Sequence, residues 1–141
     1  MNIADLRRQA ESGNLAAQTV LGVLYLDGVT VEADYGEAFR LLSAAADRGA
    51  SRAMTNLARM YAEGLGVHKD LLAALRWHEA AAYAGEFFSQ VALGRMYSRG
   101  LGVRPDASAA LKWYSEAASQ ENRVEDCDEL HEAKAYVAGL K

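Results

Sequence analysis

The chain has 141 residues, about half of them apolar, and a formal net charge of −4. This length suits one domain with a sizeable core, and the acidic balance gives no overall attraction to nucleic acid or to an anionic membrane surface. The single cysteine, Cys127, cannot form an internal disulfide, so the fold does not depend on an oxidising compartment.

Targeting signals are not evident in the sequence. Residues 1–8 lack the apolar run that follows the charges of a signal peptide. No stretch approaches the roughly eighteen consecutive apolar residues that a membrane-spanning helix needs. We therefore expect no membrane contact and a cytoplasmic location, although a secreted chain whose leader has been removed would have the same sequence.

A period of 36 residues runs through the chain. It recurs at the tyrosines Tyr25, Tyr61 and Tyr97, the glycines Gly28, Gly64 and Gly100, the aspartates Asp34, Asp70 and Asp106, and the alanines Ala45, Ala81 and Ala117. A repeat of this length is typical of small structural units that bury their apolar faces only by stacking on one another.

The apolar residues within each period follow helical spacing, which predicts an all-α fold. In chain order the predicted helices cover residues 3–12, 14–27, 35–48, 51–63, 71–84, 87–99, 107–120 and 124–138. We interpret the chain as one domain over 1–141, with repeats at about 14–49, 50–85 and 86–121. Residues 3–13 form an N-terminal half-repeat and residues 124–138 a C-terminal cap. Each full repeat then has a first helix, A, and a second helix, B.

Local signals support the ends of these helices. Gly28 and its equivalents follow the A helices, where glycine takes the left-handed conformation at little cost. Asp34 and its equivalents precede the B helices, where a carboxylate caps the first turn. Asp34 with Glu37 predicts an acidic capping box.

The cap is predicted to carry one apolar face, formed by Val124, Cys127, Leu130 and Val137. A terminal repeat needs such a face to cover the last buried layer, together with a polar outer face. Deletion of the cap is expected to expose the apolar side of the last B helix, around Leu111 and Tyr114.

The third unit shows a family pattern: Leu93-Gly94, Tyr97, Gly100, Gly102-Val103, Asp106, Ala110, Trp113 and Ala117-Ala118. This pattern resembles the Sel1-like repeat family, a relative of the tetratricopeptide repeats. The resemblance implies a short right-handed α/α solenoid whose A helices line a concave groove, and a role as a bacterial scaffold or adaptor. The first unit departs from the pattern, with Thr30 in place of glycine and Leu41 in place of tryptophan. We therefore expect its core to be less aromatic.

No catalytic, metal or cofactor site is predicted. Gly64-Leu65-Gly66 follows a helix, whereas a nucleotide-binding glycine loop follows a strand. His78 takes a packing position of the repeat, and His68 falls in a loop. The acidic neighbours of Cys127 disfavour a reactive thiolate. We expect no enzymatic activity.

The candidate binding residues lie on the side of the A helices opposite the core. They are Arg52, Arg59, Arg95, Arg99, Val23, Leu26 and Phe88. The arginines predict a preference for an acidic or C-terminal carboxylate-bearing segment of a protein or peptide. Val23 and Leu26 would receive an apolar side chain of the same partner. Arg59 and Arg95 share a repeat position, so we expect them side by side.

Three alternatives stay open at this stage. An inhibitor or immunity protein of one cognate enzyme could use the same surface, and so could a structural homodimer, so that the chain is a monomer or a weak homodimer. The acidic cap could also fold back over Arg95 and Arg99 and neutralise part of the surface from within.

Overall fold

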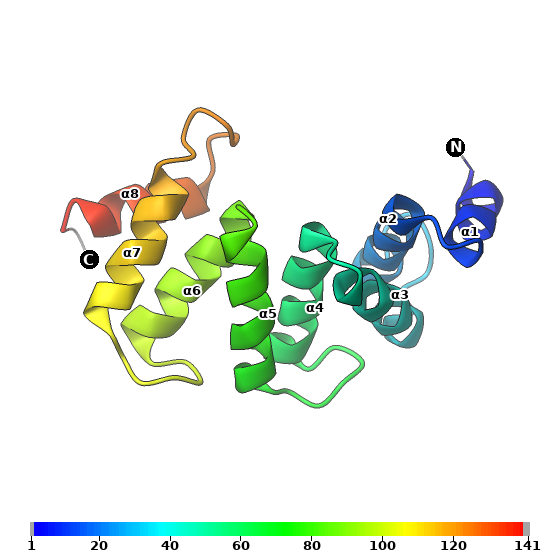
Figure 1. The fold of residues 1–141 in the computed structure, drawn as a ribbon, viewed down its shortest axis with the longest axis horizontal. Coiled ribbons are helices and arrows are strands. Elements are labelled where there is room, and N and C mark those ends of the chain that lie inside the picture. The colour runs from blue at the N-terminus through cyan, green and yellow to red at the C-terminus, as the bar shows by residue number, and fades with distance from the viewer. Residues whose placement is uncertain (1, 140–141) are drawn as a thin grey trace. The chain divides into compact units, whose positions relative to one another are not determined.

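A computed structural model describes residues 2–139, which form eight helices and no strand (Figure 1). The helices are α1 (Ile3–Glu11), α2 (Leu15–Asp27), α3 (Tyr35–Asp47), α4 (Ser51–Glu63), α5 (Leu71–Tyr83), α6 (Phe87–Arg99), α7 (Ala107–Ala118) and α8 (Asp128–Val137). The all-α prediction is therefore confirmed. The chain consists of two compact units, Met1–Ala74 and Leu75–Lys141.

The A helices α2, α4 and α6 end as the glycine pattern predicts. Their C-caps Gly28, Gly64 and Gly100 have φ values of 67°, 68° and 68°, in the left-handed region. A side chain is rarely tolerated there, which explains why glycine recurs at this point of every repeat.

The B helices α3, α5 and α7 begin at the predicted aspartates. The carboxylates of Asp34, Asp70 and Asp106 each accept a backbone N–H three residues further on, at 3.0 Å. The predicted capping box is only half correct, because Asp34 caps the helix but Glu37 does not return a bond to the Asp34 N–H. The backbone N–H of Asp34 donates to the carbonyl of Tyr25, so it is not available to Glu37, whose carboxylate pairs with Arg40 instead.

The core of the first unit lies between α1, α2 and α3. One cluster of buried residues there consists of Leu6, Ala10, Ala17, Leu21 and Leu41. Gly22 on α2 allows close approach to α3, because a Cβ built at that glycine would lie 2.7 Å from Cγ of Leu42. The predicted half-repeat thus provides the first wall of the core.

The core of the second unit is richer in aromatic side chains. Trp113 packs with Leu75, Ala82, Leu93 and Met96. A second cluster joins α6, α7 and α8 through Phe87, Val91, Ala110, Tyr114, Ala117, Leu130 and Ala133. The less aromatic core expected for the first repeat, from Leu41 in the tryptophan position, is confirmed by this contrast.

The cap helix α8 begins at Asp128 and not at residue 124. Residues 119–124 continue in turns, and Cys127 is the N-cap, with extended backbone. Asp128 and Glu129 then occupy the first helical turn, where negative charge is favourable, so the acidic run sets the start of the helix. Cys127 is partly buried and packs against the core from outside the helix.

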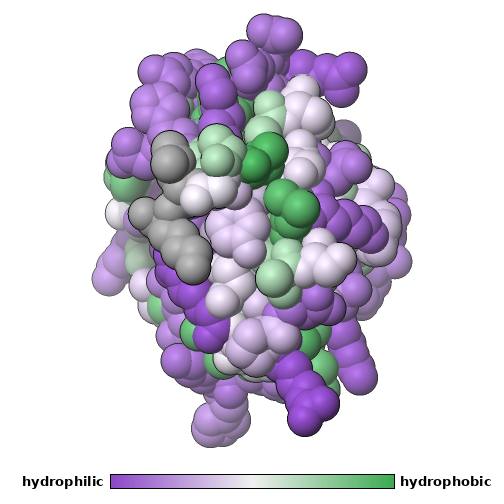
Figure 2. Space-filling view, turned by 90° about the vertical axis from the view of Figure 1, so that its left-hand side faces the viewer, coloured by the Kyte–Doolittle hydropathy of each residue, from purple (hydrophilic) through white to green (hydrophobic). Residues whose placement is uncertain are grey.

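The apolar face of α8 also differs from the prediction. Leu130 is buried as expected, but Val137 is 43% exposed, and Ala133 and Tyr136 take its place against the core. Leu111 is 46% exposed although the cap is present, whereas Tyr114 is buried and its ring lies 4.5 Å from that of Tyr136, so the cap covers Tyr114 as predicted but not Leu111. Figure 2 looks onto this end of the second unit, where hydrophilic residues surround a short strip of hydrophobic ones.

Candidate functional site

In the first unit, the side of α2 and α4 that faces away from the core carries a shallow hollow. Its volume is about 330 Å³, and it is lined by Leu15, Ala16, Thr19, Val20, Ala50, Ser51 and Arg52. Val20 is 38% exposed, and Arg52 is exposed among these largely apolar residues. An apolar hollow with one cation beside it can take an apolar side chain and a neighbouring negative charge.

Arg59 on α4 contacts an acid of its own helix. Its Nε donates to Oε2 of Glu63 at 2.7 Å, and about half of each side chain is exposed. An exposed i,i+4 pair of this kind contributes little to stability, roughly 0.3–0.5 kcal/mol. Arg59 can therefore exchange Glu63 for another carboxylate at small cost.

At the apolar end of the predicted surface, the structure does not support the assignment of Leu26. Leu26 is only 4% exposed, so its side chain belongs to the core and cannot receive a partner's side chain. Val23 is partly exposed and keeps its predicted place. Val20, on the preceding turn of α2, supplies the exposed apolar group that was assigned to Leu26.

The second unit holds a carboxylate on the same side of its A helix. Nε of Arg95 donates to both oxygens of Glu132, at 3.0 and 2.9 Å, and the Arg95 terminal nitrogen Nη2 donates to Oε1 at 2.6 Å. The Tyr114 hydroxyl also donates to Glu132, at 2.6 Å. Glu132 comes from α8, so the acidic cap does fold back onto Arg95.

The charges at this contact stabilise one another. The Arg95 guanidinium, followed by the Tyr114 hydroxyl, lowers the pKa of Glu132 against the opposing effect of burial. The hydrogen bond with Glu132 raises the pKa of Arg95, and burial raises the pKa of Tyr114 above its ordinary range. Glu132 is thus held as a carboxylate, and Arg95 is already engaged.

Arg99 and Phe88 lie on the same helix with different surroundings. Arg99 is exposed and lines a hollow of about 630 Å³ together with Ser98, Ala107, Tyr114, Glu132, Ala135 and Tyr136. Phe88 is 57% exposed and makes an edge contact with Phe87, at 5.1 Å between ring centroids. Both residues are accessible, as predicted. The predicted neighbourhood of Arg59 and Arg95 stays a prediction, because the two residues belong to separate units.

His78 takes a packing position inside the second unit, as the repeat pattern predicts. His78 is buried, and its Nδ1 lies 2.8 Å from the Ser89 hydroxyl. Burial lowers the pKa of His78 to about 4, so the ring is neutral at pH 7. Within residues 2–139, no three His, Cys, Asp or Glu side chains come close enough together to hold a metal ion. None of the helices in that range is both long and apolar enough to cross a bilayer.

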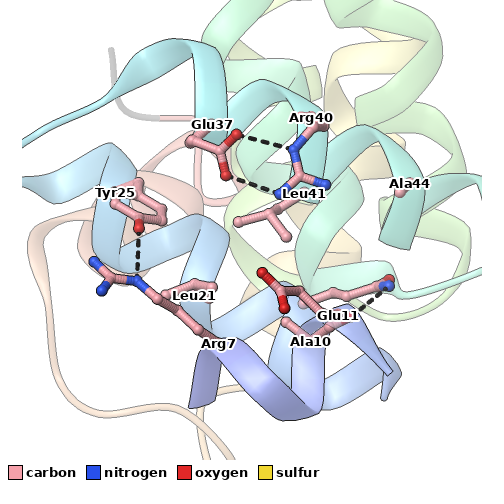
Figure 3. Close-up of a pocket in the computed structure, with 10 residues that line it drawn as sticks. Arg7, Ala10, Glu11, Leu21, Tyr25, Glu37, Arg40, Leu41 and Ala44 are labelled. Carbon is pink, nitrogen blue, oxygen red and sulfur yellow. Dashed lines mark hydrogen bonds and ion pairs between the residues drawn. The ribbon is translucent and has the colours of Figure 1, made fainter. Parts of the chain in front are cut away.

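Sequence reasoning missed a cavity between α1, α2 and α3 (Figure 3). It encloses about 270 Å³ and is lined by Arg7, Ala10, Glu11, Gln18, Leu21, Tyr25, Glu37, Arg40, Leu41 and Ala44. The signal was present in the sequence, because Leu41 replaces the tryptophan of the repeat pattern. That replacement removes ring volume at the wall of this cavity.

Comparison with known proteins gives a consistent result. The Sel1 repeat family matches residues 15–49, 51–86 and 88–122. A Sel1 repeat protein of Oxalobacter formigenes, known from its crystal structure, is 39% identical with a TM-score of 0.79, over 97% of each chain. A protective antigen of uropathogenic Escherichia coli strains that displays an SLR fold is 36% identical with a TM-score of 0.83; the match covers 96% of this chain and 28% of the antigen. No curated protein matches the chain.

Proposed function

The chain belongs to the Sel1 repeat family, whose members are generally scaffolds for protein–protein interaction, and we propose that it binds a protein partner without catalysing a reaction. The proposed contact surface is the side of α2 and α4, in the first unit, that faces away from the core. The proposed partner segment is acidic or ends in a carboxylate, with an apolar side chain beside the charge.

The contact between Arg95 and Glu132 carries this proposal. Arg95 donates to both oxygens of the Glu132 carboxylate, and the Tyr114 hydroxyl donates to the same carboxylate. A planar guanidinium recognises a carboxylate with two parallel hydrogen bonds, which gives both affinity and orientation. The A-helix side of this chain therefore already accommodates one acidic side chain, supplied by its own cap.

The first unit offers similar chemistry without a cap helix. Arg59 occupies the repeat position of Arg95, and its acidic contact is the exposed Glu63. Arg52 lies beside the apolar hollow of α2 and α4. An incoming segment could place its carboxylate on these two arginines and its apolar side chain against Val20.

The test is a double charge reversal, Arg52→Glu with Arg59→Glu. Partners are first captured from an extract of the source cells, identified by mass spectrometry and purified. Isothermal titration calorimetry then compares the two proteins at low and at physiological salt. We expect affinity to fall well over tenfold and most of the salt dependence to disappear.

A matched control separates the site from net charge. Arg8→Glu with Lys69→Glu makes the same change of charge at two exposed positions of the same unit. It should weaken binding less than threefold. Equal losses in both double variants, or unchanged affinity for the Arg52 and Arg59 variant, would place the partner elsewhere. Arg95 is avoided because its loss would also disturb the cap.

A further inference from the structure

Two triplets of helices in this chain pack in the same way; the first lies in the first unit, and the second lies in the second unit from Leu75 onward. They are α1–α2–α3 and α5–α6–α7, related by 72 positions. In the first, Gln18 Nε2 donates to the carbonyl of Ala10 at 3.2 Å. In the second, Gln90 Nε2 donates to the carbonyl of Ala82, also at 3.2 Å. The matching bonds show that these side chains hold equivalent places.

A second pair of hydrogen bonds supports the same equivalence. Arg48 donates to the carbonyl of Gly13 at 2.7 Å and lies 3.4 Å from the Gln18 side-chain oxygen. Gln120, 72 positions later, donates to the carbonyl of Gly85 at 3.0 Å and to the Gln90 side-chain oxygen at 2.7 Å. Positions can therefore be compared one by one between the triplets.

In the second triplet the ring of Trp113, which is 4% exposed, fills the space between the B-type helices α5 and α7, and Tyr83, which is 69% exposed, contacts that ring from the solvent side. Tyr83 and Trp113 meet edge to face, with ring centroids 4.9 Å apart. The ammonium of Lys112 lies 4.9 Å from the Tyr83 centroid and 4.6 Å from that of Trp113, and it donates to the Tyr83 hydroxyl at 3.0 Å. Two rings and one cation thus complete this part of the surface.

In the first triplet the same place lacks both rings. Glu11 stands in the position of Tyr83, and Leu41 in that of Trp113. What is left is the cavity of about 270 Å³ shown in Figure 3. A cavity of about 150 Å³ is enough to hold benzene, so an aromatic ring fits in the available volume.

The walls of the cavity suit an aromatic guest. Figure 3 shows Leu21 and Leu41 between a side that carries Arg7 and Tyr25 and a side that carries Glu37 and Arg40. Arg40 holds the position of Lys112, and Glu37 fixes its guanidinium with two bonds, of 2.9 and 2.8 Å. A guanidinium placed in this way can contact the face of a ring.

The rim is open and polar. Arg7, Glu11 and Arg40 are exposed, and Arg7 Nε donates to the Tyr25 hydroxyl at 3.1 Å. The carboxylates of Glu11 and Glu37 can accept a hydrogen bond from an indole N–H or a phenol hydroxyl. A side chain can thus enter from solvent with its polar atom at the rim.

We propose that this cavity binds a tryptophan or tyrosine side chain of a partner polypeptide, which takes the place that Trp113 fills in the second unit. The site is separate from the arginine surface of the A helices. The proposal therefore does not depend on the carboxylate preference of that surface.

The first experiment is a nitrogen-15 NMR titration of the full chain with N-acetyl-L-tryptophanamide, and with N-acetyl-L-leucinamide as the matched aliphatic probe. Saturable shifts are expected at the amides of Leu21, Tyr25 and Leu41, with binding at least fivefold weaker for the leucine probe. Shifts confined to other regions, or equal binding of both probes, would overturn the proposal.

The second experiment fills the cavity from within. Leu41→Trp restores the residue of the repeat pattern, and we expect it to weaken binding of the tryptophan probe at least tenfold. The double variant at Arg52 and Arg59 should bind the probe as the wild type does, which separates this site from the A-helix surface. Unchanged probe binding by a folded Leu41→Trp variant would overturn the proposal.

The reverse variant keeps the test informative if Leu41→Trp does not fold. Trp113→Leu opens the equivalent space in the second unit, so a second set of probe-induced shifts should appear near Leu93 and Tyr97. The absence of new shifts there would count against the proposed recognition. Light scattering of the free chain completes the test. If the chain self-associates and the tryptophan probe reverses this, the cavity binds a second copy of the chain, and the proposal of a separate partner is overturned.

Discussion

The helix triplets α1–α2–α3 and α5–α6–α7 have the same backbone arrangement, but different side chains occupy the space between their first and third helices. In both triplets a glutamine side chain, Gln18 or Gln90, donates a hydrogen bond of 3.2 Å to a backbone carbonyl of the preceding helix. Yet the space beside Leu41 is open, whereas Trp113 and Tyr83 close it in the second triplet. The comparison teaches that the repeat fixes the scaffold, while single side chains decide whether a given place is core or cavity.

The two triplets also differ in their buried polar groups. His78 and Ser89 form a buried pair in the second, 2.8 Å apart. The equivalent positions in the first are Leu6 and Ala17, both apolar and buried. One unit therefore carries a group that responds to pH inside its core, and the other has only apolar side chains at these positions.

The largest expected effect comes from Trp113→Leu, which copies the first triplet into the second. Trp113 is 4% exposed and contacts Tyr83 and Lys112, so its loss leaves a cavity and two unsupported neighbours. We expect a loss of about 3 kcal/mol in the free energy of unfolding, measured by urea denaturation. Leu41→Trp is the control and should cost less than about 1 kcal/mol. Similar losses in both would mean that the two places are not equivalent.

The next effect is the pH dependence that His78 gives to the second unit. Its pKa is lowered by burial to about 4 from an ordinary 6.5, so the folded state resists protonation. The unfolded chain binds a proton on this ring at about pH 6.5, whereas the folded chain does so only near pH 4. The free energy of unfolding is therefore unaffected above pH 6.5 and decreases as the pH falls from 6.5 towards 4. At pH 5 the loss should be about 2 kcal/mol relative to pH 7.

The double variant His78→Leu with Ser89→Ala tests whether His78 causes this pH dependence, because it introduces the residues found at the equivalent positions of the first triplet, Leu6 and Ala17. Urea denaturation at pH 7 and at pH 5 should then show most of the difference removed. A double variant that keeps the full difference would assign the pH dependence to other groups.

A smaller effect is expected from Glu132→Gln in the cap. The carboxylate holds Arg95 and Tyr114, and its loss should cost about 1–2 kcal/mol, seen as faster hydrogen exchange of the α8 amides. Because the pKa of Glu132 is lowered, the same stabilisation should fade in the wild type as pH falls below about 4.5. Glu125→Gln, at an exposed position before α8, should leave the exchange unchanged. Slow exchange in Glu132→Gln would show that apolar packing alone holds the cap.

Much of the fold was predictable because the signals for it are local. The glycine that ends each A helix and the aspartate that starts each B helix act within one turn, so a period of 36 positions is enough to locate them. The start of α8 was predicted less well, since the cap has lost the repeat and its acidic run sets the boundary.

The site was less predictable because its decisive contacts join distant residues. Arg95 and Glu132 are 37 positions apart, and nothing in the sequence selects Glu132 among the acids of the cap. Leu26 was assigned to the surface together with Val23, but its side chain is only 4% exposed. The cavity beside Leu41 follows from a missing ring, whose consequence depends on what the surrounding side chains leave open.

The smallest expected effect is that of Arg59→Ala, and it distinguishes Arg59 from Arg95, which has the same repeat position. Arg59 contacts Glu63 at an exposed site, so Arg59→Ala should change the free energy of unfolding by less than about 0.5 kcal/mol. Arg95→Ala should cost about 2 kcal/mol, because it leaves the partly buried carboxylate of Glu132 without its main partner. Urea denaturation of both variants at pH 7 measures the difference. If the two losses are equal, Arg59 has a structural role like that of Arg95 and is not available to a partner. A near-neutral Arg59→Ala that weakens partner binding would assign this arginine to recognition, since the folded state does not depend on it.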